Sequence, residues 1–119
     1  MLMTRVAAVG LCFCALAALA ASPAEPDRVQ RGRAIAHDWY KGNCLACHQI
    51  PADPTAVTMA NIGPPLVDMR TRFPDRAALR AQIWDSTVRN PMTVMPPFGK
   101  HRVLTEEEID LVVDYVYAN

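Results

Sequence analysis

Two cysteines and a histidine stand close together in the order Cys44-Leu45-Ala46-Cys47-His48, and this C-x-x-C-H pattern constrains the chain more than any other feature. Two thiols on one turn can both reach the vinyl groups along one edge of a haem and form thioethers. The histidine that follows then lies over the iron and supplies an imidazole nitrogen. We therefore expect one covalently bound haem c, attached through Cys44 and Cys47, with His48 as the proximal iron ligand.

Other uses of a C-x-x-C pair fit this sequence less well. A zinc site needs further ligands, and beyond the N-terminal segment the chain has no other cysteine and, besides His48, only His37 and His101. A thioredoxin-like redox pair needs a strand–helix–strand setting, and no segment predicts strands. A simple disulfide would leave His48 without a role.

The N-terminal segment differs from the rest of the chain. Arg5 is its only charged residue, and residues 6–21 are apolar but shorter than the roughly 20 residues that span a bilayer. A basic start, an apolar middle and small residues at the end are typical of a secretory signal peptide. We expect residues 1–20 to be this peptide, cut after Ala20. A later cut near Ala24 and an uncleaved membrane anchor are the alternatives.

Residues 21–119 then form one small periplasmic domain. The large residues before Cys12 and Cys14 do not suit lipoprotein processing, so we assign these two thiols to the apolar run. The full chain has 12 basic and 12 acidic residues, which gives no reason to expect nucleic acid as a partner. We also expect no membrane contact in the mature form. A domain of this size often needs a cofactor to complete its core.

Two proline-rich loops predict the surroundings of the iron. Gly63 permits a tight turn, and the prolines after it hold the chain rigidly, so we expect the Pro64 carbonyl to accept a hydrogen bond from His48. Residues 90–99 contain three prolines, and a stiff loop can hold a weak thioether ligand at low entropic cost. We expect Met95 to be the distal iron ligand, with Phe98 near the haem edge.

Other side chains able to bind iron are weighed against Met95. Met92, in the same loop, is its main rival. The remaining candidates are expected elsewhere: Met59 and Met69 in the core, His37 on a helix surface, and Lys100 and His101 in solvent.

The rest of the chain predicts an all-α domain in which helices and long loops surround the haem. Helices are expected over residues 27–40, 75–89 and from Thr105 to near the C-terminus. Asp27 and Asp75 are expected at the starts of the first two, and T-x-x-E at Thr105 forms a capping box. The apolar residues expected to face inward are Val29, Ala36, Trp39 and Tyr40, then Leu79, Ile83 and Trp84, then Ile109, Val112, Val113, Tyr115 and Val116.

A glycine within the first predicted helix points to a close helix crossing. Gly32 costs helix stability, so we expect a packing reason for it. The first and last helices are expected to cross there, with Gly32 near Tyr115. The run of Glu106, Glu107 and Glu108 suits the N-terminal end of the helix dipole, and we prefer this explanation to a docking patch.

Taken in order along the chain, these motifs resemble the class I cytochromes c over nearly all of residues 21–119. A narrower resemblance is to the SoxX family, the mono-haem subunits of the SoxAX complex of bacterial periplasmic sulfur oxidation. It is carried by five stretches: G-N-C-L-A-C-H at 42–48, G-P-P-L at 63–66, I-W-D at 83–85, M-P-P-F-G at 95–99 and L-T-E-E-E-I at 104–109.

The narrower resemblance implies a role as well as a fold. It implies a heterodimer with a SoxA-like cytochrome, which holds the catalytic haem, and transient contact with a SoxYZ-like carrier and a soluble electron acceptor. The complex is an L-cysteine S-thiosulfotransferase that oxidatively joins thiosulfate to a cysteine of the carrier. On this chain, His48 and Met95 match the iron ligands, and no residue is expected to be catalytic, so it would carry electrons and not be an enzyme alone.

Two other functions remain open. A free soluble shuttle to an oxidase or dehydrogenase would be a monomer that docks weakly. A small peroxidase or gas-binding protein would need a five-coordinate iron, so its resting ligand set would not depend on Met95.

Overall fold

The computed structural model describes residues 24–119, so the predicted signal peptide lies outside the described residues. These residues form helices and turns without any strand, as the sequence predicts. The elements follow in the order α1 (Glu25–His37), η1 (Cys44–Ala46), α2 (Met69–Arg72), α3 (Arg76–Trp84), η2 (Ser86–Val88) and α4 (Glu106–Ala118). Within this part of the chain, no helix is long and apolar enough to cross a membrane.

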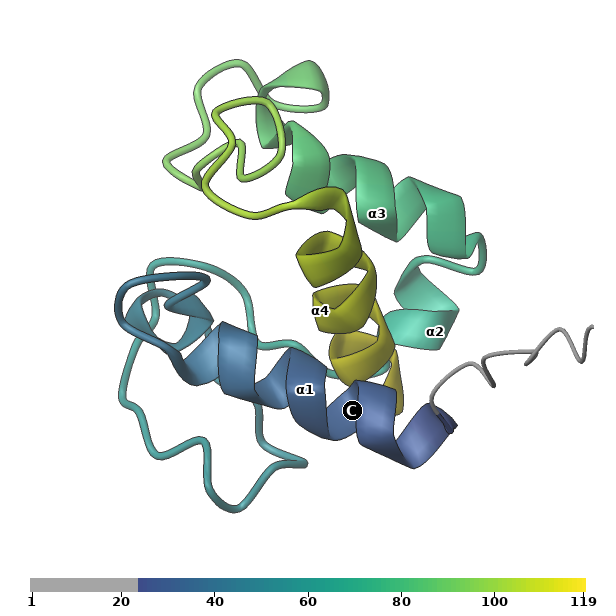
Figure 1. Ribbon diagram of the computed structural model, residues 1–119. Coiled ribbons are helices and arrows are strands. Elements are labelled where there is room, and N and C mark those ends of the chain that lie inside the picture. The colour runs from purple at the N-terminus through teal and green to yellow at the C-terminus, as the bar shows by residue number, and fades with distance from the viewer. Residues whose placement is uncertain (1–23) are drawn as a thin grey trace, which may run out of the picture.

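Helix α4 is the centre of the packing. Its predicted capping box is present: Thr105 Oγ1 accepts from the Glu108 amide, and the Glu108 carboxylate accepts from the Thr105 amide. All five residues expected on its inner face are buried, and Leu111 is buried with them. Figure 1 shows α1 crossing α4 on one side and α3 packing on another, so α4 connects α1 with α3.

The close crossing of α1 and α4 is confirmed. A Cβ added to Gly32 would lie 1.9 Å from the Leu111 carbonyl oxygen and 3.0 Å from Tyr115 Cβ. Such distances leave no room for a side chain. Gly32 therefore lets the two backbones approach at the expected place, and this packing requirement explains a glycine inside a helix.

The predicted limits of α1 were wrong at both ends. The helix starts two residues early because Pro26 is accommodated in the first turn, where its missing N–H is not needed, and Asp27 is not the cap. It ends at His37, because Asp38 adopts an extended backbone with φ −71° and ψ 121°. Trp39 and Tyr40 lie beyond the end and are 83% and 98% exposed. Val29 packs against the core and Ala36 is buried, as expected.

The helix predicted over residues 75–89 is two elements. Asp75 caps α3 as expected, accepting from the Ala77 amide at 2.9 Å. Leu79 and Ile83 are buried, and Trp84 packs against the core. The chain then leaves the helix at Asp85, whose side chain accepts from the Thr87 amide and starts the short turn η2. This local side-chain hydrogen bond competes with helix propagation, as aspartate commonly does.

The segment between η1 and α3 is mostly irregular and contains the short helix α2. Its start follows Asp68, which has a left-handed backbone. Of the two methionines assigned to the core, Met69 is 3% exposed, as expected. Met59 is 92% exposed, so its assignment to the core was wrong. Met59 lies in an irregular loop, whereas Met69 begins α2 and belongs to the core cluster.

Acidic side chains on the outer face of α4 are paired with bases from neighbouring elements. Asp114 binds both Arg28 and Arg76, and Asp110 binds Arg80. The three glutamates of its first turn pair with Arg80, Arg31 and Lys41. Exposed pairs of this kind contribute at most about 1 kcal/mol each. The glutamates of the first turn therefore connect α4 to neighbouring segments, in addition to their expected role at the N-terminus of the helix.

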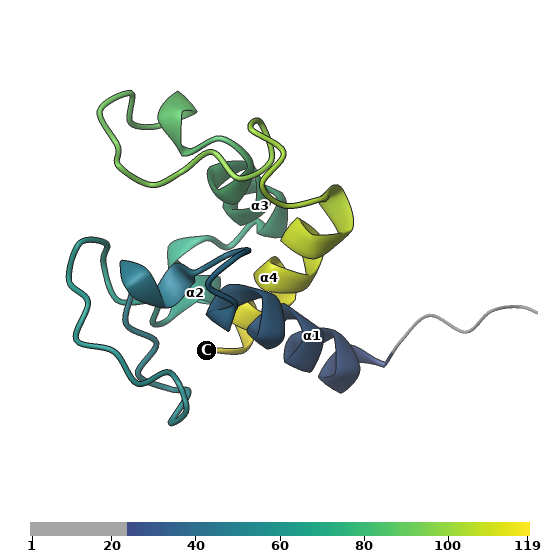
Figure 2. The same cartoon turned by 60° about the vertical axis from the view of Figure 1, so that its left-hand side comes forward.

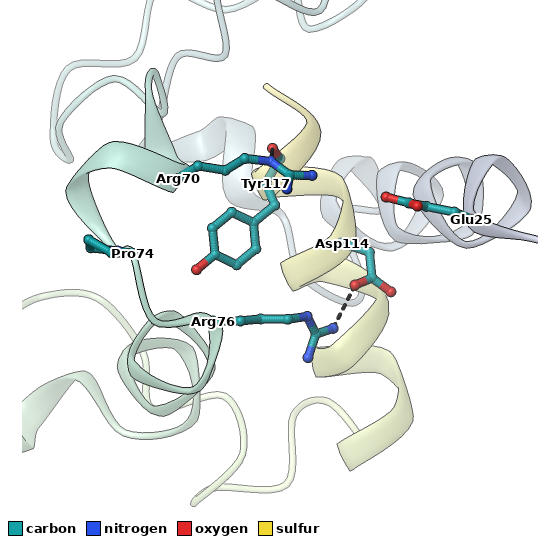
Figure 3. Close-up of a pocket in the computed structure, with 6 residues that line it drawn as sticks. All are labelled: Glu25, Arg70, Pro74, Arg76, Asp114 and Tyr117. Carbon is teal, nitrogen blue, oxygen red and sulfur yellow. Dashed lines mark hydrogen bonds and ion pairs between the residues drawn. The ribbon is translucent and has the colours of Figure 1, made fainter.

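A hollow of about 280 Å³ is lined by residues of α1, α2, α3 and α4 and by Pro74. Figure 3 shows how these residues lie. Arg76 pairs with Asp114, and Arg70 Nε donates to the Tyr117 carbonyl at 2.9 Å. The Arg70 guanidinium also lies 5.3 Å from the centre of the Tyr117 ring. Arg76 thus binds Asp114 and Arg70 binds Tyr117, and we interpret the hollow as a packing junction between helices.

A buried polar network fastens the loop after residue 48 to the α1–α4 crossing. The Tyr115 hydroxyl donates to the Asp53 carboxylate at 2.6 Å, and Arg33 Nε donates to the same oxygen at 3.0 Å. His37 Nε2 lies 3.1 Å from the Tyr115 hydroxyl oxygen, to which it donates. His37 is therefore half-buried and bonded, and its assignment to the helix surface was wrong.

Candidate functional site

The C-x-x-C-H segment forms one tight turn at the end of a chain reversal. Asn43 adopts a left-handed backbone, and the 3-10 turn η1 follows. The amides of Cys47 and His48 both bond to the Cys44 carbonyl, at 3.1 and 2.9 Å. This compact turn presents both thiols and the imidazole to the same cavity.

The cavity has a volume of about 750 Å³ and lies between the η1 turn and the loop of residues 90–104. Figures 1 and 2 both show these two segments facing each other beside α4. Its walls include all six residues singled out from the sequence: Cys44, Cys47, His48, Pro64, Met95 and Phe98. Its volume is typical of small-molecule and cofactor sites.

The imidazole of His48 is held from two sides. Its Nδ1 lies 2.7 Å from the Pro64 carbonyl oxygen, the acceptor proposed from the sequence. A carbonyl there requires a proton on Nδ1, which leaves Nε2 as the nitrogen with a free lone pair. On the other side, a Cβ added to Gly63 would lie 2.3 Å from His48 Cε1. The backbone at Gly63 does not have a positive φ, so this glycine makes room for the ring instead of permitting a turn.

No disulfide joins Cys44 and Cys47. Burial raises the pKa of Cys44 to about 12, so its thiol stays protonated at neutral pH. Reactive redox cysteines have lowered pKa values, because the thiolate is the nucleophile. The environment of Cys44 therefore argues against this thiol as a thioredoxin-like nucleophile.

Met95 faces the cavity from the loop that follows η2. It is half-buried and packs against the core, whereas Met92, which also borders the cavity, is 87% exposed. Three side chains surround Met95: Ser86 donates to its carbonyl oxygen at 2.7 Å, Thr93 accepts from its amide at 3.1 Å, and Gln82 Nε2 lies 4.0 Å from its sulfur.

The far end of the Met95 loop is anchored on the end of α3. The amides of Phe98 and Gly99 donate to the carbonyls of Ile83 and Trp84, at 3.2 and 3.1 Å. A Cβ added to Gly99 would lie 2.2 Å from the Trp84 ring. The Trp84 side chain of the I-W-D stretch therefore leaves room only for glycine at this position of the M-P-P-F-G stretch. Lys100 is exposed as expected, and it pairs with Asp85 at 2.7 Å.

Several residues of the site were not assigned to it from the sequence, although some of them were expected to face inward. Apolar side chains line much of the wall and rim: Trp39, Ile62, Leu66, Leu79, Ile83, Val94, Val103, Leu104, Val112 and Val116. The Asp-Ser-Thr run after α3 is a typical turn signal and could have directed attention to Ser86. Nothing in the local pattern marks Gln82, which reaches Met95 only through the tertiary fold.

The arrangement fits a haem bound through this cavity. The donor set comprises two thiols in one turn, an oriented imidazole and a thioether, which are the groups used by haem c proteins. The described charged side chains along the wall, Lys41 and Arg72, are both cationic, which suits the carboxylates of a haem. The apolar walls suit its macrocycle.

Comparison with known proteins identifies the family. The family model described as "Cytochrome C oxidase, cbb3-type, subunit III" matches residues 27–116. The chain belongs to this family of cytochrome c domains. The all-α class I cytochrome c-like fold expected from the sequence is thereby confirmed, and with it haem binding and electron transfer as the general function of the domain.

A relative of this cytochrome c domain is the "Uncharacterized lipoprotein" of Aquifex aeolicus (strain VF5). The two are 36% identical over 77 residues, which make up 65% of this chain and 36% of the relative. The matched segment thus spans only about a third of the relative's length.

Proposed function

We propose that this chain is a periplasmic mono-haem c-type cytochrome that serves as the electron-transfer subunit of a SoxAX-type complex. The observation that carries the cytochrome assignment is the single cavity onto which Cys44, Cys47, His48 and Met95 converge. The SoxAX role is supported by the sequence stretches that resemble SoxX.

In this proposal, Cys44 and Cys47 hold one haem through thioethers. When bound, the haem iron supplies one-electron transfer between its ferric and ferrous states. His48 offers Nε2 to the iron because Pro64 engages Nδ1. Met95 offers its thioether from the opposite loop. Histidine and methionine together favour a higher reduction potential than two more basic ligands would.

The chain's own residues suit an electron carrier better than a sulfur-transferring enzyme. Both cysteines beyond the N-terminal segment are assigned to haem, so no cysteine there is left as a sulfur nucleophile. Joining thiosulfate to a cysteine of a SoxYZ-like carrier releases a proton and an electron pair. A SoxA-like partner would hold that chemistry, and this chain would pass the electrons singly to a soluble acceptor.

The rim of the cavity supports docking to another protein. Exposed apolar side chains border it, among them Trp39, Ile62, Met92 and Val94. Apolar side chains at the centre of an interface are typical of stable complexes. A heterodimer would cover this rim and bring a partner's redox centre close to the haem.

A free electron shuttle is the second candidate. It is favoured by the family's description, which names an oxidase subunit. A shuttle would use the same rim for brief encounters, so the two functions differ in the lifetime of the complex.

Gentle purification of the tagged chain from its own host grown on thiosulfate separates the two candidates. The SoxAX role predicts a stoichiometric cytochrome partner and more haem per complex than this chain alone carries. Recovery of a lone mono-haem protein would contradict the SoxAX role and favour the shuttle.

Replacement of Met95 tests the distal ligand. Met95→Ala should open the sixth coordination site, remove the iron–sulfur charge-transfer band and lower the reduction potential. Met92→Ala is the matched control and should leave both unchanged, because its side chain is largely exposed. If Met92→Ala, and not Met95→Ala, removes the band, the ligand assignment is wrong.

A further inference from the structure

We propose that Ser86 is a positioning residue that holds Met95 on the iron, an inference that rests on the proposed function. Ser86 begins η2, immediately after the chain leaves α3 at Asp85. Its side chain is 0% exposed in an otherwise apolar core. Its hydroxyl donates to the Met95 carbonyl oxygen at 2.7 Å. This bond connects the end of α3 directly to the proposed ligand.

The bond between the Ser86 hydroxyl and the Met95 carbonyl attaches the loop to the end of α3 at the proposed ligand itself. From Asn90 to Val94 the loop is mostly exposed, and the amide of Met92 is bonded only locally, to the Asn90 side chain at 3.1 Å. From Phe98 onward, the chain is bonded to the carbonyls at the end of α3. Ser86 supplies the buried attachment between these two parts.

Thr93 restrains the other side of the same residue. Its Oγ1 accepts from the Met95 amide at 3.1 Å, while Ser86 binds the Met95 carbonyl. Both peptide groups flanking the Met95 side chain are therefore fixed. A thioether is a weak neutral ligand, so its occupancy depends on how strongly the loop favours the bound conformation.

Loss of the Ser86 hydroxyl should therefore shift the population of Met95 away from the iron. A buried carbonyl that loses its donor is destabilised, and an open loop could return that carbonyl to water. The conformation with Met95 released would gain relative to the bound one. Any external ligand that competes for the same coordination position would then bind more tightly.

Imidazole titration of the ferric haem-loaded protein measures this shift. Added imidazole displaces the methionine, and loss of the iron–sulfur charge-transfer band reports the displacement. Ser86→Ala should lower the half-saturating imidazole concentration about tenfold, from the usual size of one buried hydrogen bond. Thr93→Ala, at a less buried position, should shift it in the same direction and gives a second measurement if Ser86→Ala fails to fold.

Thr87→Ala is the matched control. It removes a hydroxyl from the same turn, and that hydroxyl donates to Asp85 and does not contact Met95. The imidazole midpoint should be unchanged. An equal shift in Thr87→Ala and Ser86→Ala would overturn the inference, because it would show a general loosening of η2.

A double-mutant cycle with Met95→Ala separates failure of this inference from failure of the proposed function. If Met95 is the ligand, Met95→Ala alone tightens imidazole binding, and adding Ser86→Ala then has no further effect. A Met95→Ala protein with unchanged imidazole binding would contradict the ligand assignment itself. A tightened Met95→Ala together with an unaffected Ser86→Ala would overturn only the role of Ser86.

Discussion

At the scale of single residues, the site requires two glycines, because a side chain at either position would collide with a neighbouring ring. Gly63 and Gly99 stand where an added Cβ would strike the rings of His48 and Trp84. The first contact sets the position of the proposed proximal ligand, and the second sets the end of the Met95 loop. Both glycines therefore belong to the construction of the haem cavity.

Gly63→Ala should disturb the proximal side of the haem. The new methyl group would lie within 2.3 Å of the His48 ring, so the ring must shift and its bond to the Pro64 carbonyl must weaken. We expect reduced haem incorporation and a lower reduction potential, measured by haem content per chain and by redox titration. Ile62→Ala, at the exposed neighbour, should change neither. Normal values for both in Gly63→Ala would contradict this account of the glycine.

At the scale of elements, the crossing of α1 and α4 anchors the segment that carries the C-x-x-C-H turn. The backbones meet at Gly32, and the Asp53–Tyr115 network fastens the loop after His48 to the same crossing. The chain entering and leaving the C-x-x-C-H turn is thus anchored to the most buried part of the fold.

Gly32→Ala should destabilise the domain by about 1–3 kcal/mol or more, because the added methyl meets a backbone carbonyl that cannot move independently of α4. Chemical denaturation of the haem-loaded protein measures the change. Gln30→Ala, at an exposed position of α1, is the control and should lie within about 0.5 kcal/mol of the unmodified protein. A neutral Gly32→Ala would contradict the observed crossing distance.

The Asp53 network should make stability depend on pH. Desolvation alone would raise the Asp53 pKa, but hydrogen bonds from Thr55, Tyr115 and Arg33 outweigh it and hold the pKa well below its ordinary value of 3.8. A lowered carboxyl pKa stabilises the fold above the unfolded pKa, and this contribution is lost as the pH falls through the folded value. Burial, followed by the charge of Arg33, lowers the pKa of His37 below 6.5, so acidification below that value also destabilises the fold.

Asp53→Asn should therefore cost stability at neutral pH, by about 1–3 kcal/mol for a buried hydrogen-bonded group. The difference from the unmodified protein should shrink as the pH is lowered below about 4. Denaturation curves at several pH values measure it. Asp38→Asn, at the end of α1, is a control for removal of a carboxylate outside the Asp53 network. A deficit that stayed constant into strong acid would contradict the ionised network.

The same elements show what the sequence could and could not predict. The capping box, the buried face of α4 and the Gly32 crossing depend on local spacing and were confirmed. The break at Asp85 depends on one side-chain hydrogen bond that competes with a helix, and helical periodicity does not detect it. Met59 and Met69 look alike in sequence, yet one is exposed and the other buried, because only Met69 has a helix and a core behind it.

At the scale of the whole molecule, two loops border one cavity beside α4 and face each other across it. One carries the thiols and His48, and the other carries Met95. The C-x-x-C-H turn could be assigned from the sequence because its chemistry is contained in five residues. The contacts of Ser86 and Gln82 with Met95 could not, because they form only when the second loop folds back onto α3.

Intact mass measurement under denaturing conditions tests whether Cys44 and Cys47 hold a haem covalently. The protein would be produced with its export signal in a host that matures c-type cytochromes. We expect the chain to carry one haem after unfolding and acid extraction, and to lose that retained haem when both Cys44 and Cys47 are replaced by alanine. A haem-free mass for the unmodified chain, or haem retained by the double variant, would contradict this expectation.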